Sequence, residues 1–288
     1  MKRYLFSLLG LIVIAAAGWK LTQYQSYYTS DYVDVVLSSQ VLNEDRKVFI
    51  RLPKGYDKAH SYPLIIRTDG NFNLARWDEV LSSLAEQGKV EDAILVSIPN
   101  QFWTQTRNRD LVPPYARQDV AIEARPESDN DPAIFGRADR FLRFIETELL
   151  PYLEKNYSIN DNRILSGFSA GGSFVLYTMV TKPALFDGYF AFSPAAWYDD
   201  SVVVREFAKG LANIQSKPKY IYLSIGGAEN DIITGSFHGL LDALEQHAPA
   251  NVRWGHSISE GAGHSQNPVV SVPLALSEYH HFRKNQLM

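Results

Sequence analysis

The chain has 288 residues, 45% of them hydrophobic and 12% aromatic, which is enough for one large domain with a substantial core or for two small domains. Its formal net charge is −4 at pH 7 and no basic run stands out, so nucleic acids and anionic surfaces are not expected partners. The absence of cysteine excludes disulfides, thiolate chemistry, cysteine-based zinc sites and a lipid-modified N-terminal cysteine.

The N-terminal residues have the pattern of a targeting segment. Lys2-Arg3 precedes an apolar run that ends in Ala15-Ala16-Ala17, and this predicts a secretory signal peptide within residues 1–19, cleaved near Ala17. The alternative is an uncleaved anchor in the inner membrane, although the run is shorter than the ~20 residues that span a bilayer comfortably. The protein is therefore expected to be exported, as a periplasmic or secreted protein or as one anchored to the inner membrane.

After a polar, tyrosine-rich linker at residues 20–31, residues 32–288 are predicted to form one domain in which apolar runs alternate with helical stretches. The predicted strands are residues 33–37, 47–52, 64–67, 93–98, 163–165, 188–192, 219–225 and 253–258. The predicted helices are residues 77–87, 137–157, 172–181, 202–213, 237–247 and 268–282. This alternation predicts an α/β fold with a mostly parallel, doubly wound sheet and helices on both faces. The first two strands lack an intervening helix and are expected to be antiparallel.

A Gly-x-Ser-x-Gly pattern, Gly167-Phe168-Ser169-Ala170-Gly171, lies between a predicted strand and a predicted helix. In a nucleophile elbow, a tight turn presents one serine at the top of a sheet, and the glycines avoid collisions with neighbouring backbone. The N-terminus of the following helix offers free amide groups to an anionic intermediate. Ser169 is therefore the predicted nucleophile of a serine hydrolase. The alternative is a turn of small residues that only packs a helix on a sheet.

A serine nucleophile needs a base and an acid that orients the base, and in doubly wound hydrolases the chain order is serine, acid, histidine. His264 lies in a glycine-flanked loop after a predicted strand and before the last helix, and it is the predicted base. Glu229 and Asp231 both follow the strand at residues 219–225, at the sheet edge where such sites form. Glu229 is the preferred acid and Asp231 remains the alternative.

The oxyanion of such a reaction needs two preorganised backbone donors. The amide of Ala170, directly after the nucleophile, is one candidate. The second is expected in the loop after the strand at residues 64–67, from the amide of Asn71 or, as the next choice, of Phe72. No metal site and no cofactor are predicted, because the paired histidines near the C-terminus point to different faces of a helix and no phosphate-binding glycine loop occurs.

Further segments resemble the Putative esterase branch of the α/β-hydrolases, which includes esterase D-like, feruloyl-esterase-like and trilactone siderophore esterases. The matching segments are Leu52-Pro-Lys-Gly-Tyr-Asp57, residues 62–70, Arg107-Asn-Arg-Asp-Leu-Val-Pro113, residues 141–152 and Ser193-Pro-Ala-Ala-Trp197. They occur in the family's order within residues 35–282. The resemblance implies an α/β-hydrolase fold for residues 32–288, the triad Ser169, Glu229 and His264, and cleavage of carboxylic esters.

The resemblance also implies that Trp197, with the segment at residues 107–110, lines or shapes the acyl or alcohol side of the site. Arg107, Phe72 and Phe168 are candidates for contact with the substrate. The irregular, polar stretch at residues 101–131 is expected to be a lid or a wall of that site. The expected partner is a small-molecule or saccharide-linked ester, and no oligomeric state is predicted. Two alternatives stay open: an acyltransferase that uses a sugar or lipid hydroxyl in place of water, and a binding protein with a decayed catalytic site.

Overall fold

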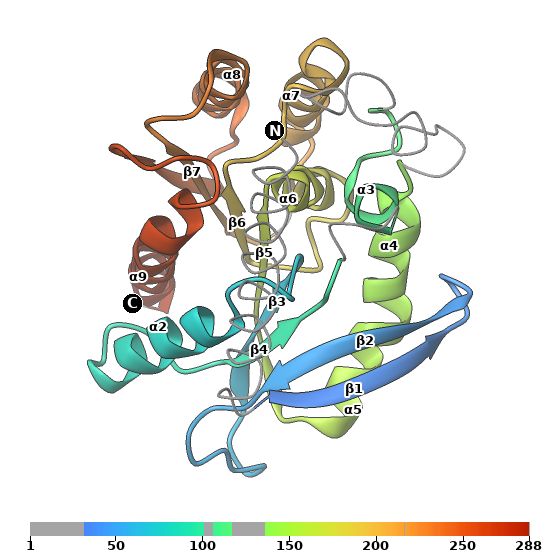
Figure 1. Ribbon diagram of the computed structural model, residues 1–288. Helices are drawn as coiled ribbons and strands as arrows, with labels where there is room; N and C mark the ends of the chain where they lie inside the picture. The colour runs from blue at the N-terminus through green and yellow to red at the C-terminus, as the bar shows by residue number, and fades with distance from the viewer. Residues whose placement is uncertain (1–31, 101–105, 117–135, 216, 288) are drawn as a thin grey trace, which may run out of the picture.

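The computed structural model describes residues 32–100, 106–116, 136–215 and 217–287, which form one sheet covered by helices on both faces (Figure 1). The strands are β1 Tyr32–Ser39, β2 Glu44–Arg51, β3 Tyr62–Arg67, β4 Ile94–Ser97, β5 Ile159–Phe168, β6 Gly188–Phe192, β7 Lys219–Gly226 and β8 Val252–Ser259. Their order across the eight-stranded sheet is β1-β2-β4-β3-β5-β6-β7-β8. The β1–β2 and β2–β4 pairs are antiparallel and the others are parallel, so the predicted mostly parallel sheet with an antiparallel start is confirmed.

Every predicted helix is present, with shifted ends. The helices are α2 Leu74–Glu86, α3 Thr106–Leu111, α4 Ala138–Phe144, the π-helical turn Ile145–Leu149, α5 Leu150–Asn156, α6 Ala170–Thr181, α7 Tyr198–Leu211, α8 Asp231–His247 and α9 Asn267–Leu287. Helix α3 was not predicted: it lies inside the stretch at residues 101–131 that was expected to be irregular. That expectation is wrong for residues 106–111, whereas residues 101–105 and 117–131 lie outside the described part of the chain.

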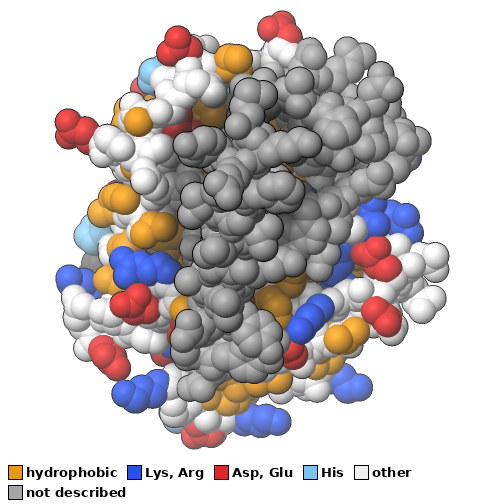
Figure 2. All heavy atoms as spheres, in the orientation of Figure 1, with side chains coloured by type: hydrophobic (Ala, Val, Ile, Leu, Met, Phe, Trp, Pro, Cys, Tyr) orange, Lys and Arg blue, Asp and Glu red, His pale blue; other side chains and the backbone are white. Residues whose placement is uncertain are grey.

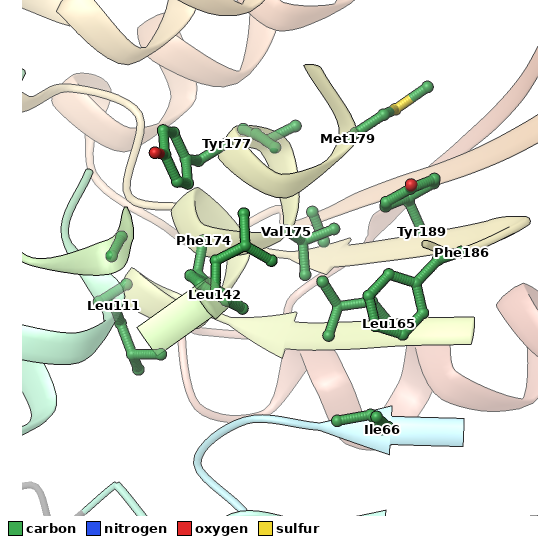
Figure 3. Packing of buried hydrophobic residues seen from close by; sticks show 14 of the residues in the cluster. Ile66, Leu111, Leu142, Leu165, Phe174, Val175, Tyr177, Met179, Phe186 and Tyr189 are labelled. Atoms are coloured by element: carbon green, nitrogen blue, oxygen red, sulfur yellow. The ribbon is translucent and has the colours of Figure 1, made fainter. Parts of the chain in front are cut away.

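Two hydrophobic clusters fill the two faces of the sheet. Because side chains alternate along a strand, Ile65 and Ile164 face the cluster formed with α2 and α9, whereas their neighbours Ile66 and Leu165 face the larger cluster on the other side. Figure 3 shows Leu165 of β5 beneath Val175 of α6 in that larger cluster. The apolar residues of α6 thus bury the helix against the sheet, with its N-terminus at the end of β5.

The carboxyl ends of the parallel strands meet at one edge of the sheet, and backbone hydrogen bonds join the segments that follow them. The amide of Ser169 after β5 donates to the carbonyl of Phe192 at 3.0 Å, and the amide of Ala195 donates back to the carbonyl of Ser169 at 3.0 Å. The amide of Ser193 donates to the carbonyl of Ser224 in β7 at 2.7 Å. This edge is where open α/β sheets carry their sites.

Acidic and basic side chains are interspersed over the described parts of the face shown in Figure 2. None of the helices in residues 32–287 that the structure describes is both long and apolar enough to cross a membrane. The predicted signal peptide or anchor at residues 1–19 and the predicted linker at residues 20–31 lie outside the described residues.

Candidate active site

Ser169 occupies a strained backbone position between β5 and α6. Its φ is 56° and its ψ is −119°, a left-handed conformation that residues other than glycine rarely adopt and that clusters at functional sites. Although Ser169 is the N-cap of α6, its side chain makes no capping hydrogen bond. The hydroxyl is thus left available at the edge of the sheet, as a nucleophile requires.

Both glycines of the elbow lie close to neighbouring atoms. A Cβ atom at Gly167 would lie 2.1 Å from the backbone carbonyl oxygen of Gly171, which is incompatible with a side chain. A Cβ at Gly171 would lie 2.3 Å from the side-chain Oγ1 of Thr68 in the segment after β3, so this hydroxyl would have to move. The pattern therefore brings the start of α6 against the strand end and against the neighbouring loop, which carries the predicted oxyanion donor.

The structure brings His264 and Glu229 into direct contact. Nδ1 of His264 lies 2.5 Å from Oε2 of Glu229, whose side chain is fully buried, whereas the His264 side chain is 34% exposed. Asp231, the alternative acid, is exposed in the first turn of α8, where Asn230 caps the helix by accepting from the amide of Ile233 at 3.0 Å. Of the two candidates, Glu229 therefore makes the contact that orients the imidazole.

The other carboxylate oxygen of Glu229 is held by two donors. Oε1 accepts from the hydroxyl of Ser193 at 2.5 Å and from the amide of Gly226 at 2.8 Å. Burial on its own would raise the pKa of Glu229, but the hydrogen bonds from His264, Ser193 and Gly226 together lower it below the usual value. The carboxylate stays ionised and can stabilise an imidazolium on His264.

His264 lies over the residue that precedes the nucleophile. The imidazole packs against the ring of Phe168 with the ring centroids 4.7 Å apart and the planes tilted by 45°. Because Phe168 is directly followed by Ser169, this contact places the base beside the elbow. Phe168 is only partly buried, so it stays accessible as a candidate for contact with the substrate.

The loop after β3 forms a tight turn in which one backbone amide is already hydrogen-bonded and another is not. The amide of Phe72 donates to the carbonyl of Asp69 at 3.0 Å, so it is already used, while the amide of Asn71 has no hydrogen-bond partner among the described residues. The amide of Ala170 lies in the first turn of α6, where helical amides have no intrahelical acceptor. The amides of Asn71 and Ala170 therefore stay the candidate oxyanion donors, whereas the amide of Phe72 is engaged in the turn.

Arg107 on α3 clamps this loop. Its guanidinium makes two parallel hydrogen bonds to Asp69, from Nε to Oδ1 at 2.8 Å and from Nη2 to Oδ2 at 2.7 Å, and both side chains are buried. Burial alone would lower the pKa of Arg107, but the charge and hydrogen bonds of Asp69 raise it above the usual value. With its donors engaged in this way, Arg107 has the geometry of a loop anchor. Its predicted place on the substrate side stays a prediction.

Two further side chains of the site carry unused hydrogen-bonding groups. The indole N–H of Trp197, just before α7, and the amide group of Asn71 are buried and have no partner among the described residues. The Trp197 ring packs edge-on against Tyr198, with the centroids 5.4 Å apart. No group of three or more His, Asp or Glu residues that could hold a metal ion occurs in the described ranges.

Sequence reasoning missed Ser193 and Asn267, which support the acid. Ser193 directly follows β6, at the start of the matching segment Ser193-Pro-Ala-Ala-Trp197, and Asn267 begins α9. The only sequence signal was that Ser193 is a polar residue directly after a buried parallel strand. Its pairing with Glu229 depends on the order of β6 and β7 in the sheet, which the sequence pattern does not show.

A comparison with protein-family models matches residues 39–265 to the family described as "Putative esterase". The chain belongs to this family. It is similar to the ferri-bacillibactin esterase BesA of Bacillus subtilis, with 29% identity over 203 residues, 67% of this chain and 69% of that protein. It is also similar to the siderophore enterobactin esterase of Emericella nidulans, with 33% identity over 151 residues. That match covers 50% of this chain and only 49% of the relative.

Solved structures show the same fold. The BES protein from Bacillus cereus superposes with a TM-score of 0.74 and 25% identity, covering 86% of this chain and 95% of that chain. An IroE-like serine hydrolase from Shewanella oneidensis gives a TM-score of 0.78 at 23% identity, and the match covers 87% of this chain and 80% of that chain. The predicted resemblance and the α/β-hydrolase fold are thus confirmed, and the esterase is a carboxylic ester hydrolase. The acyltransferase and the decayed binding protein find no support in these relatives.

Proposed function

We propose that this esterase is an exported serine hydrolase that cleaves its substrate through an acyl-enzyme on Ser169. His264 is the general base and Glu229 is the acid that orients it. The contact of 2.5 Å between Nδ1 of His264 and the buried carboxylate of Glu229 carries the proposal, because it sits beside a serine in a strained elbow. Nucleophile, base and acid supplied in this way define a serine hydrolase site.

The chemistry follows from the protonation that this contact favours. Glu229 accepts the Nδ1 proton of His264, which leaves Nε2 free to take the proton of the Ser169 hydroxyl as its oxygen attacks the ester carbonyl. The amides of Ala170 and Asn71 bind the oxyanion. When the tetrahedral intermediate collapses, His264 returns the proton to the leaving alcohol. Water then attacks the acyl-enzyme while His264 takes its proton. His264 passes this proton to the Ser169 oxygen as the carboxylic acid product leaves, and this restores Ser169.

We propose a siderophore ester as the substrate class, because two relatives are named ferri-bacillibactin esterase and siderophore enterobactin esterase. Hydrolysis of trilactone siderophores, aryl esters and p-nitrophenyl esters by the wild type and by Ser169→Ala tests the proposal. We expect the wild type to have its highest kcat/KM with the trilactone, and we expect Ser169→Ala to hydrolyse none of the three substrates. A preference for plain short-chain esters would overturn the substrate class.

We propose export on the N-terminal pattern of Lys2-Arg3, an apolar run and Ala15-Ala16-Ala17. Intact-mass measurement of the protein from a cell-envelope fraction should show loss of roughly the first 17 residues. A full-length protein in the membrane would support the uncleaved anchor instead. A full-length protein in the cytosol would contradict export.

A further inference from the structure

The acid Glu229 is held by a buried network of side chains beyond the residues of the triad. Ser193 is fully buried and adopts a left-handed conformation with a φ of 42°, which places its hydroxyl 2.5 Å from Oε1 of Glu229. Its backbone amide is fixed by the carbonyl of Ser224 in β7 at 2.7 Å. The strained backbone therefore serves to aim one hydroxyl at the carboxylate.

Asn267 determines the direction in which that hydroxyl donates. Its Nδ2 donates to the oxygens of Ser193 and Ser224, each at 2.9 Å, and its Oδ1 accepts from Ser259 at 2.8 Å and from Ser271 at 2.7 Å. All four hydrogen-bonding positions of the amide are thus used, so its orientation is fixed. Because Asn267 donates to the oxygen of Ser193, the Ser193 proton is left to point at Glu229.

The network links all the segments that carry the triad. Asn267 follows His264 by three residues, at the start of α9, and Ser224 lies on the strand that precedes Glu229. The segment that contains Ser193 exchanges backbone hydrogen bonds with Ser169. A shift of any one segment would therefore change the contact between Glu229 and His264. A buried, fully connected network of this kind rigidifies the groups that it joins.

We propose that Ser193, oriented by Asn267, is the positioning residue that keeps Glu229 in line with His264. The inference rests on the proposed triad. Ser193 acts on the reaction through Glu229, and its hydroxyl donates to the carboxylate oxygen that faces away from the imidazole. Its loss should therefore lower the rate of the chemical step and leave substrate binding unchanged.

A double-mutant cycle measures this dependence. Ser193→Ala is expected to lower kcat about 10- to 100-fold, the effect of removing a hydrogen bond to a charged group, with KM unchanged within about twofold. In a Glu229→Gln background, the same change should alter kcat by less than about twofold, because His264 is already in the wrong tautomer and no carboxylate remains for Ser193 to position. A Ser193 that only supported the fold would lower kcat equally in both backgrounds, and that result would overturn the proposal.

Two further variants separate a specific effect of Ser193 from a general loss of structure and test the role of Asn267. Ser236→Ala removes another buried serine hydroxyl, which donates to the carbonyl of Ile233 within α8 at 2.9 Å, and it should leave kcat unchanged. Asn267→Asp keeps the side-chain volume but replaces the NH₂ group that donates to Ser193 by a carboxylate oxygen, which can only accept. The value of kcat should therefore fall as in Ser193→Ala. An active Asn267→Asp would refute the role of Asn267. Full activity of Glu229→Gln alone would instead refute the triad itself.

Discussion

Glu229→Gln is the substitution whose effect follows most directly from the geometry of the site. Oε1 of Glu229 accepts two hydrogen bonds, from Ser193 and Gly226, so the oxygen of the new amide should stay there and its NH₂ group should face His264. Nδ1 of His264 must then accept a hydrogen bond, which moves the ring proton to Nε2. That nitrogen can no longer take the proton of Ser169. The variant thus holds the base in the wrong tautomer while the site keeps its shape.

The expected loss is about 10⁴-fold in kcat, the magnitude associated with such a tautomer change in a catalytic triad, and it corresponds to about 5.5 kcal/mol of transition-state stabilisation. Steady-state hydrolysis of an activated aryl ester measures it, with thermal unfolding as a check that the variant is folded. Asp231→Asn is the matched control, because Asp231 is exposed at the start of α8 and should leave kcat unchanged. A large loss of kcat in Asp231→Asn together with a nearly unchanged kcat in Glu229→Gln would refute the assignment of Glu229 as the acid.

Three further outcomes follow from the described contacts. Arg107→Leu leaves the buried carboxylate of Asp69 without its partner and should lower the free energy of unfolding in urea by about 3–5 kcal/mol, so a loss below about 1 kcal/mol would speak against the clamp. Gly167→Ala forces a Cβ to within 2.1 Å of the Gly171 carbonyl and should abolish fluorophosphonate labelling, whereas normal labelling would contradict the close approach. The pKa of Glu229 is lower in the folded protein than its usual value of 4.5. Its carboxylate therefore stabilises the folded state above about pH 4.5, and this stabilisation is lost as the pH falls through the lower folded pKa. The difference in unfolding free energy between wild type and Glu229→Gln should therefore narrow on acidification, and a difference independent of pH would refute this.

The sheet was predictable because most of its strands are buried on both faces and read as continuous apolar runs. Strand β6 has the predicted bounds, Gly188–Phe192, since a polar residue flanks the run at each end. Strand β5 is longer than predicted, because its first residues are polar and their pairing begins at Ile159, opposite Tyr62. A strand end stabilised only by its neighbour leaves no hydrophobic pattern.

Helix α3 escaped prediction for a related reason. Its Arg107 and Asp110 are buried by ion pairs with Asp69 and with Arg46, residues far away in the sequence. Charged residues buried in this way cannot be distinguished by composition from a solvated loop, so the segment was read as irregular. Long-range ion pairs therefore have to be seen in the structure.

The order and placement of Ser169, Glu229 and His264 could be read from the sequence, because each follows an apolar strand at the same edge of the sheet. The supporting residues could not. The serines that surround Asn267 come from three strand ends and from α9, and only the observed strand order brings them together. The choice between the amides of Asn71 and Phe72 likewise depended on a turn hydrogen bond to Asp69.

The central claim is that Ser169 forms a covalent acyl-enzyme. Labelling the purified protein with a fluorophosphonate probe, followed by peptide mapping, tests this directly. The account predicts a single modified peptide with the label on Ser169, and no labelling of Ser169→Ala. A label on Ser173 or Ser265, or undiminished labelling of the Ser169→Ala variant, would contradict it.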